Sequence, residues 1–276
     1  MTVKWKVPLF DEDNAYQKVR ILRPEEAEAL LSHIDVRDEK TWKYLQDRNI
    51  STEDVQVWLR FLLFTGCRFP EMIIVKNNPK LRLSNGTLRI PNYPGKEMRT
   101  RKARNILLSD MGRDMLDAFF ATPPIPIDPE NYENDSKEVI SSMSSMMHIA
   151  AEKIELEKMS FTIKQKSKNI GADGQKIKIK KTTKDGREIE VYDTTNKFKT
   201  ITTDGCSLRT MRKTWESWLI HSFGGEKIET QVFLSQGHTR ETAMRYYLNV
   251  GFDEEDIKDI KKCTLGYGVV NQKTHD

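Results

Sequence analysis

Residues 62–71 read LLFTGCRFPE, and this stretch decides the fold that the sequence predicts. It closes an apolar helix that begins near Ser51, where Asp54, three residues later, completes a capping box. Apolar side chains recur along this helix at the spacing of one helical face, namely Val55, Trp58, Leu59, Leu62 and Leu63. Gly66 ends the helix, so Arg68 stands directly after its last turn.

Helical and extended patterns continue on both sides of this stretch. Arg23-Pro-Glu-Glu opens an earlier helix, with proline and acids in its first turn. Asn85-Gly86 predicts a hairpin turn between strands at 81–83 and 88–90, and an apolar run predicts a third strand at 106–108. Further helices are predicted at 112–120, 138–158, 208–222, 230–247 with a break at Gly237, and 251–260. The predicted fold class is therefore α+β, mostly helical, with a small antiparallel β-sheet.

A Lys-rich stretch at residues 161–203 alternates charged with apolar residues, and Gly171, Gly174 and Asp185-Gly186 mark its turns. This pattern predicts a basic β-rich insertion over about residues 160–203. Such a charge run is either a solvated surface or a surface that lies along the phosphates of a nucleic acid. The sequence leaves both readings open.

Composition limits the class of protein. With 276 residues, 37% of them hydrophobic, and a net charge of +4, the chain is an ordinary globular protein that could bind an acidic partner. Its three cysteines have neither zinc-site nor disulfide-framework spacing, which indicates a reducing, cytoplasmic setting. Residues 1–14 do not read as a signal peptide, no apolar run is long enough to span a membrane, and no metal or other cofactor is expected.

The last third of the chain contains two arginines, a histidine and two tyrosines that together suit phosphodiester chemistry. Arg209-Thr-Met-Arg212 is followed by Gly237-His238 and then by Tyr246-Tyr247. Arginine supplies fixed, permanently charged donors for the nonbridging oxygens of a phosphodiester. A tyrosine that attacks the phosphorus conserves the bond as a phosphotyrosine, so the strand can be resealed without ATP.

In this order and spacing, the residues resemble the tyrosine recombinase (phage integrase) family. Thr65-Gly-Cys-Arg68-Phe-Pro-Glu71 looks like the family's first arginine box, and Arg209-Thr-Met-Arg212 stands where the family commonly writes His-x-x-Arg. Gly237-His238 matches its Gly-His, and Tyr247 lies nine residues after His238, the usual spacing. Within the family, Arg209 and the ending Arg245-Tyr-Tyr-Leu are most similar to integrases of archaeal viruses or plasmids.

The resemblance implies a role for each of these residues. Arg68 and Arg212 would clamp the scissile phosphate, and His238 would contact it or act as general base for Tyr247. The family also uses a lysine of the hairpin turn as general acid, a role open to Lys96 or Lys102, with Lys96 preferred because it lies closest after the second strand.

Two departures from the family pattern affect these assignments. Arg209 replaces the commoner histidine, so it can bind phosphate but is a poor proton shuttle. Tyr246 is the alternative nucleophile to Tyr247. Glu71 is interpreted as a structural partner for a nearby arginine rather than as a catalyst.

The resemblance covers most of residues 21–250, between an N-terminal segment at 1–20 and a C-terminal tail at 251–276. Because Arg23-Pro comes early in the chain, the resemblance leads us to expect either a catalytic domain without the family's usual DNA-clamping domain or a minimal enzyme. The implied function is site-specific integration or recombination of mobile or viral DNA through a 3′-phosphotyrosyl intermediate, by a homotetramer on double-stranded DNA at a specific site. A type IB topoisomerase and a catalytically inactive DNA-binding accessory protein are the alternatives.

Overall fold

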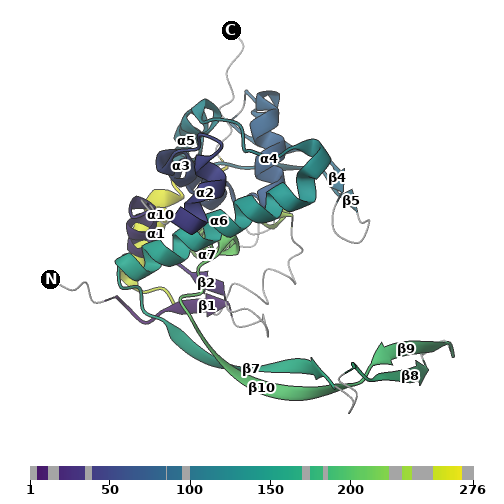
Figure 1. The fold of residues 1–276 in the computed structure, drawn as a ribbon. Coiled ribbons are helices and arrows are strands. Elements are labelled where there is room, and N and C mark those ends of the chain that lie inside the picture. The colour runs from purple at the N-terminus through teal and green to yellow at the C-terminus, as the bar shows by residue number, and fades with distance from the viewer. Residues whose placement is uncertain are drawn as a thin grey trace, which may run out of the picture.

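A computed structural model describes residues 5–11, 19–34, 39–84, 86–94, 100–169, 175–182, 186–223, 232–237 and 251–268. This part of the chain is α+β, as predicted, and consists of a helical body from which a long two-stranded ribbon extends (Figure 1). The helices are α1 (Pro24–Ser32), α2 (Glu39–Gln46), α3 (Thr52–Thr65), α4 (Phe69–Asn77), α5 (Asp110–Ala121), α6 (Tyr132–Lys153), α7 (Leu208–Ser222) and α10 (Glu254–Cys263). Residues 232–236 are also helical.

Helix α3 lies at the centre of the body and packs against α5 and α7. The capping box predicted at its start is confirmed, because Ser51 and Asp54 exchange side-chain and backbone hydrogen bonds. Its apolar face is buried, with the Phe61 ring stacked on Phe119 at 3.9 Å and Phe64 edge-on to Trp215 at 5.8 Å between ring centroids. This packing fixes the end of α3, where Gly66 and Arg68 follow, against the helix that carries Arg212.

The sheets are smaller and more numerous than predicted. The described residues form antiparallel pairs of β1 (Leu9–Asp11) with β2 (Val19–Ile21), β3 (Leu88–Ile90) with β6 (Arg104–Ile106), β4 (Tyr93–Pro94) with β5 (Thr100–Arg101), β7 (Met159–Lys168) with β10 (Thr194–Thr203), and β8 (Lys178–Thr182) with β9 (Glu188–Tyr192).

The strand predicted at 81–83 is wrong. Pro79–Leu81 forms a 3-10 turn, Arg82 makes only an isolated bridge to Leu88, and β3 pairs instead with β6. Proline presets the backbone for such a turn and cannot donate to a strand ladder.

The predicted basic β-rich segment is confirmed, and we call residues 159–203 the β arm. Its stem is the β7–β10 ribbon, in which ten residue pairs run from Met159 opposite Thr203 to Lys168 opposite Thr194. The β8–β9 hairpin forms the outer part of the arm, and in Figure 1 strands β7, β8, β9 and β10 extend away from the helices. Among the described residues, no helix is both long and apolar enough to cross a membrane.

Arg20 binds both ends of the arm to the body. Its side chain is fully buried and ion-pairs with Glu26 at 2.6 Å, and its Nη1 donates to the Glu157 carbonyl just before β7. Its backbone N–H donates to the Gly205 carbonyl just after β10 at 3.0 Å. The base of the arm is therefore fixed to the core.

A second contact at the arm base depends on pH. His148 Nδ1 on α6 lies 2.8 Å from Asp204 Oδ1, and this hydrogen bond raises the pKa of His148. Burial would raise the pKa of Asp204, but the contact with His148 lowers it on balance. The pair thus stabilises the fold at pH values above the ordinary pKa of an aspartate, where Asp204 is charged and His148 is protonated. This stabilisation is lost as the pH rises through the elevated pKa of His148.

We expect His148→Gln to lower the thermal midpoint most near about pH 5.5, and less and less above about pH 7. Because His148 is half exposed, the loss should be about 1 kcal/mol or less. Thermal melts across pH measure the loss, with His33→Gln as the control, since the exposed His33 ring hydrogen-bonds to the Ala29 carbonyl in its own helix and not to a carboxylate in that bond. A difference that stays constant from acid to mildly alkaline pH would contradict the assignment.

Candidate active site

Glu71 is the centre of a buried cluster that begins directly after α3. Arg68 is the N-cap of α4, and its backbone N–H and Nη1 donate to the two carboxylate oxygens of Glu71 at 2.8 and 2.9 Å. Tyr93 on β4 adds a hydroxyl donor at 2.7 Å. Burial would raise the pKa of Glu71, but the neighbouring guanidinium groups outweigh it and hold that pKa at about 2. Glu71 is therefore a permanent anion that orients arginines, as interpreted from the sequence.

Arg104 on β6 is a member of this cluster that the sequence reasoning missed. Its Nη1 and Nη2 donate to both Glu71 oxygens at 2.6 and 2.7 Å, and its Nε donates to the Ser235 carbonyl at 2.9 Å. Only 7% of the side chain is exposed. The alternation of a strand could have indicated it, because Arg104 lies two residues before the buried Ile106 and so on the same face. Arg104 thereby connects the β3–β6 sheet to both α4 and residues 232–236.

Arg212 on α7 joins the end of α3 to the turn at Gln236. Its Nη1 donates to the Gly66 carbonyl, and its Nη2 donates to the Gln236 carbonyl at 2.5 Å and pairs with Glu216 at 2.6 Å. Burial lowers the pKa of Arg212; Glu216 opposes this effect, and the nearby charges of Arg68 and Arg104 add to it. The guanidinium still stays protonated, because arginine titrates far above neutral pH.

Gly66 is required by this arrangement. Its φ of 63° ends α3 in the left-handed conformation, and a Cβ there would lie 2.2 Å from Gln236 Oε1. Gln236 itself donates from Nε2 to the Thr65 carbonyl at 3.3 Å. Thr65 and Gly66 of the first arginine box thus allow the end of α3 to lie close to Gln236, in the segment that leads to His238.

The structure brings two of the predicted site residues, Arg68 and Arg212, into one cluster. Arg209 lies in the first turn of α7, one helical turn before Arg212, and is exposed. Lys102 is exposed between β5 and β6. Lys96, His238, Tyr246 and Tyr247 lie outside the described residues, although the described chain reaches Gly237, directly before His238.

The cluster is suited to binding a phosphate. Arg68, Arg104 and Arg212 carry three positive charges against the two carboxylates of Glu71 and Glu216. Arg68 is the most accessible of the three arginines, with 24% of its side chain exposed compared with 12% for Arg212. A phosphate would therefore meet Arg68 first, on a guanidinium whose orientation Glu71 has already fixed.

Among the described residues, the other reactive side chain beside this cluster is a cysteine. Cys67 is buried beside it, and burial raises the pKa of its thiol to about 12, so the thiol stays protonated. Within the described ranges, no group of His, Cys, Asp and Glu side chains has the arrangement of a metal site.

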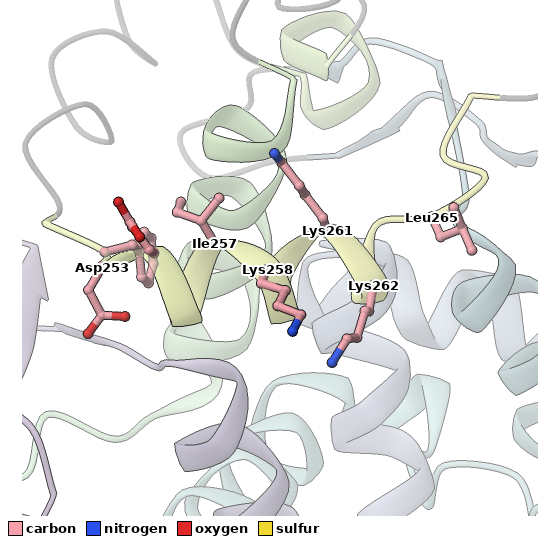
Figure 2. Close-up of a pocket in the computed structure, with 8 residues that line it drawn as sticks. Asp253, Ile257, Lys258, Lys261, Lys262 and Leu265 are labelled. Carbon is pink, nitrogen blue, oxygen red and sulfur yellow. The ribbon is translucent and has the colours of Figure 1, made fainter.

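A separate hollow of about 630 Å³ lies along α10 (Figure 2). The described residues that line it are Phe252, Asp253, Glu254, Ile257, Lys258, Lys261, Lys262 and Leu265. Neither Arg68 nor Arg212 is among them, so the hollow is distinct from the arginine cluster. Helix α10 packs on α1 and α7 of its own chain, where Arg23 pairs with Asp256 at 3.0 Å. No family model, curated protein or solved structure matches the chain.

Proposed function

We propose that the protein is a site-specific DNA strand transferase of the tyrosine recombinase type, with Tyr247 as its nucleophile. The observation that supports this best is the convergence on one point of the first arginine box, Arg212 and the turn that leads to His238. These segments are far apart in the sequence, and the same residues carry the motif resemblance. Packing alone does not account for three arginines beside the two carboxylates of Glu71 and Glu216, because a buried positive charge in excess of its partners is costly.

In the proposed reaction, Arg68 and Arg212 bind the nonbridging oxygens of the scissile phosphate and stabilise the charge of the transition state. The phenolic oxygen of Tyr247 attacks the phosphorus, and His238 receives the phenol proton. The bond between phosphorus and the 5′ oxygen breaks, and that oxygen takes a proton from Lys96 or Lys102. Attack by the 5′-hydroxyl of a second strand then reverses these steps and reseals the DNA.

The substrate in this proposal is double-stranded DNA at a specific recombination site, bound by a homotetramer. Because a strand must pass between two duplexes, one subunit for each of the four strands is the simplest assembly. The arginines provide the charge stabilisation, so the proposal requires no metal ion or other cofactor.

The decisive experiment is to trap the covalent complex. A duplex that contains the recombination site and a nick close to the scissile bond loses its 5′-hydroxyl fragment after cleavage, so the phosphotyrosine accumulates. We expect denaturing gels to show a protein–DNA adduct and peptide mass spectrometry to locate the DNA on Tyr247.

Absence of an adduct on any candidate site, or an adduct outside residues 246–247, would contradict the proposal. Relaxation of a supercoiled plasmid that lacks a recombination site would instead identify a type IB topoisomerase.

A further inference from the structure

The stem of the β arm has the shape of a DNA-binding element. Ten residue pairs of β7 and β10 span about 30 Å at the rise of a β-strand, which is the length of roughly nine base pairs. A two-stranded antiparallel ribbon also has the width that the major groove of B-DNA admits. Because the arm extends away from the helices, both of its faces can approach a partner (Figure 1).

The positive charge of the protein is concentrated in the arm. Residues 159–203 contain eleven Lys and Arg against five Asp and Glu, a net charge of +6, whereas the whole chain has +4. The two stem strands contain five lysines and no acidic residue. Of these lysines, Lys168, Lys197 and Lys199 are exposed. The rest of the molecule is therefore slightly acidic, and the arm is the part that would attract a polyanion.

Charge is balanced differently in the outer hairpin. There Lys178 pairs with Glu190 at 3.4 Å and Lys180 pairs with Glu188 at 3.6 Å. These pairs reduce the positive field of the β8–β9 segment, so the unbalanced charge lies on the stem, nearer the body.

The remaining side chains of the stem also suit a nucleic acid. Threonine and serine hydroxyls, such as the hydrogen-bonded pair Ser160 and Thr202, are common donors to phosphate oxygens. Phe198, between Lys197 and Lys199 in the sequence, is 74% exposed. An apolar ring in this setting gains stability only when a partner covers it, and exposed aromatic side chains contact bases or sugars in this way.

The arm leads directly into the helix that carries Arg212 of the arginine cluster. Strand β10 ends at Thr203 and α7, which carries Arg212, begins at Leu208. The connection is held by Thr210 Oγ1, which donates to the Gly205 carbonyl at 3.1 Å, and by Arg20, which binds both ends of the arm. A duplex at Arg68 and Arg212 would therefore have flanking DNA within reach of the stem.

We propose that the β7–β10 stem binds the backbone of duplex DNA that flanks the scissile phosphate. The inference rests on the proposed function in taking DNA as the partner, and it adds a second DNA contact outside the arginine cluster. The contribution of the stem to DNA affinity is independent of the DNA sequence and strongly dependent on salt concentration, because lysines that neutralise phosphates release condensed counterions.

The test compares two triple variants with equal charge change. The stem variant is Lys168→Ala, Lys197→Ala and Lys199→Ala; the control is Lys258→Ala, Lys261→Ala and Lys262→Ala on α10. Binding to a 40-base-pair duplex is measured by fluorescence anisotropy over a range of salt concentrations. We expect the stem variant to lower the slope of log affinity against log salt by about 2 to 3, and to weaken binding at least about tenfold at low salt. The control should change the slope by less than about 1.

Further measurements separate the possible outcomes. Phe198→Ser should weaken binding several-fold with an unchanged salt slope, and circular dichroism and thermal melts verify that each variant is folded. Equal slopes for the wild type and the stem variant, or equal losses in both triple variants, would overturn the inference. So would a stem variant that changes the oligomeric state without DNA while binding DNA normally, because the stem would then bind a second copy.

The covalent assay on a nicked duplex with flanks of about five base pairs tests the proposed function separately, since this DNA is too short to span the stem. An adduct that forms equally in the wild type and the stem variant, together with the slope change, supports both proposals. A slope change without any adduct in the wild type supports the stem and contradicts the proposed reaction.

Discussion

Arg68→Ala is expected to slow formation of the covalent DNA complex by about 10³-fold while leaving the fold intact. Arg68 has the most exposed guanidinium of the cluster and is proposed to bind the phosphate first. Glu71 keeps the bidentate pair with Arg104, and its bond from the backbone N–H of residue 68 survives the substitution. The free energy of unfolding should therefore fall by about 1 kcal/mol or less.

The measurement is the single-turnover rate of adduct formation on a nicked duplex, beside urea denaturation. Arg60→Ala is the matched control, because Arg60 is a partly exposed arginine of α3 that pairs with Glu28. Arg68→Lys should restore only part of the rate, since lysine keeps the charge but loses the planar fork. A rate for Arg68→Ala equal to that of Arg60→Ala would exclude Arg68 from phosphate binding.

Glu71→Ala is expected to lower the free energy of unfolding by about 3 to 5 kcal/mol. The substitution leaves Arg104 buried without its carboxylate and removes the acceptor of the Tyr93 hydroxyl. Urea denaturation at neutral pH measures the loss, and Glu28→Ala is the control for a surface pair, with an expected cost of about 1 kcal/mol or less.

Acid should reduce the difference between the wild type and Glu71→Ala. The folded pKa of Glu71 is about 2, below its ordinary value of 4.5, so its contribution is complete above about pH 5 and declines as pH falls toward 2. The double substitution Glu71→Leu with Arg104→Met should cost less than the sum of the single losses, because the buried Arg104 guanidinium is then no longer left without its carboxylate. Additive losses would mean that the two side chains act independently.

The local patterns of the sequence predicted much of the helical body. The Arg23-Pro24 start of α1 and the Ser51 capping box of α3 were correct because their determinants lie within four residues of one another. The turn at Gly86 was correct as well, since Gly86 has a φ of 77° and its N–H donates to the Leu83 carbonyl. The same local pattern predicts that the strands on either side of this turn pair with each other. In the structure β3 pairs with β6 instead, because strand pairing is decided by tertiary contacts that a local pattern does not contain.

The candidate site was predictable only where a motif marked it. The motif resemblance selected Arg68 and Arg212, and the structure places both in one cluster. Arg104 belongs to no motif, and its importance depends on Glu71 and Ser235, which are distant in sequence. The bond from Arg212 to the Gly66 carbonyl likewise joins positions that no local pattern relates.

The pairing of Met159 with Thr203 means that the chain leaves and re-enters the helical body at neighbouring points. The β arm is thus a loop whose two ends lie together, and the entropic cost of closing such a loop rises only with the logarithm of its length. Residues could be added to or removed from the outer part of the arm at little cost to folding of the helical body, because the hydrogen bonds from Arg20 hold the base of the arm. During evolution, the length of the arm can therefore change while the geometry of the arginine cluster stays the same.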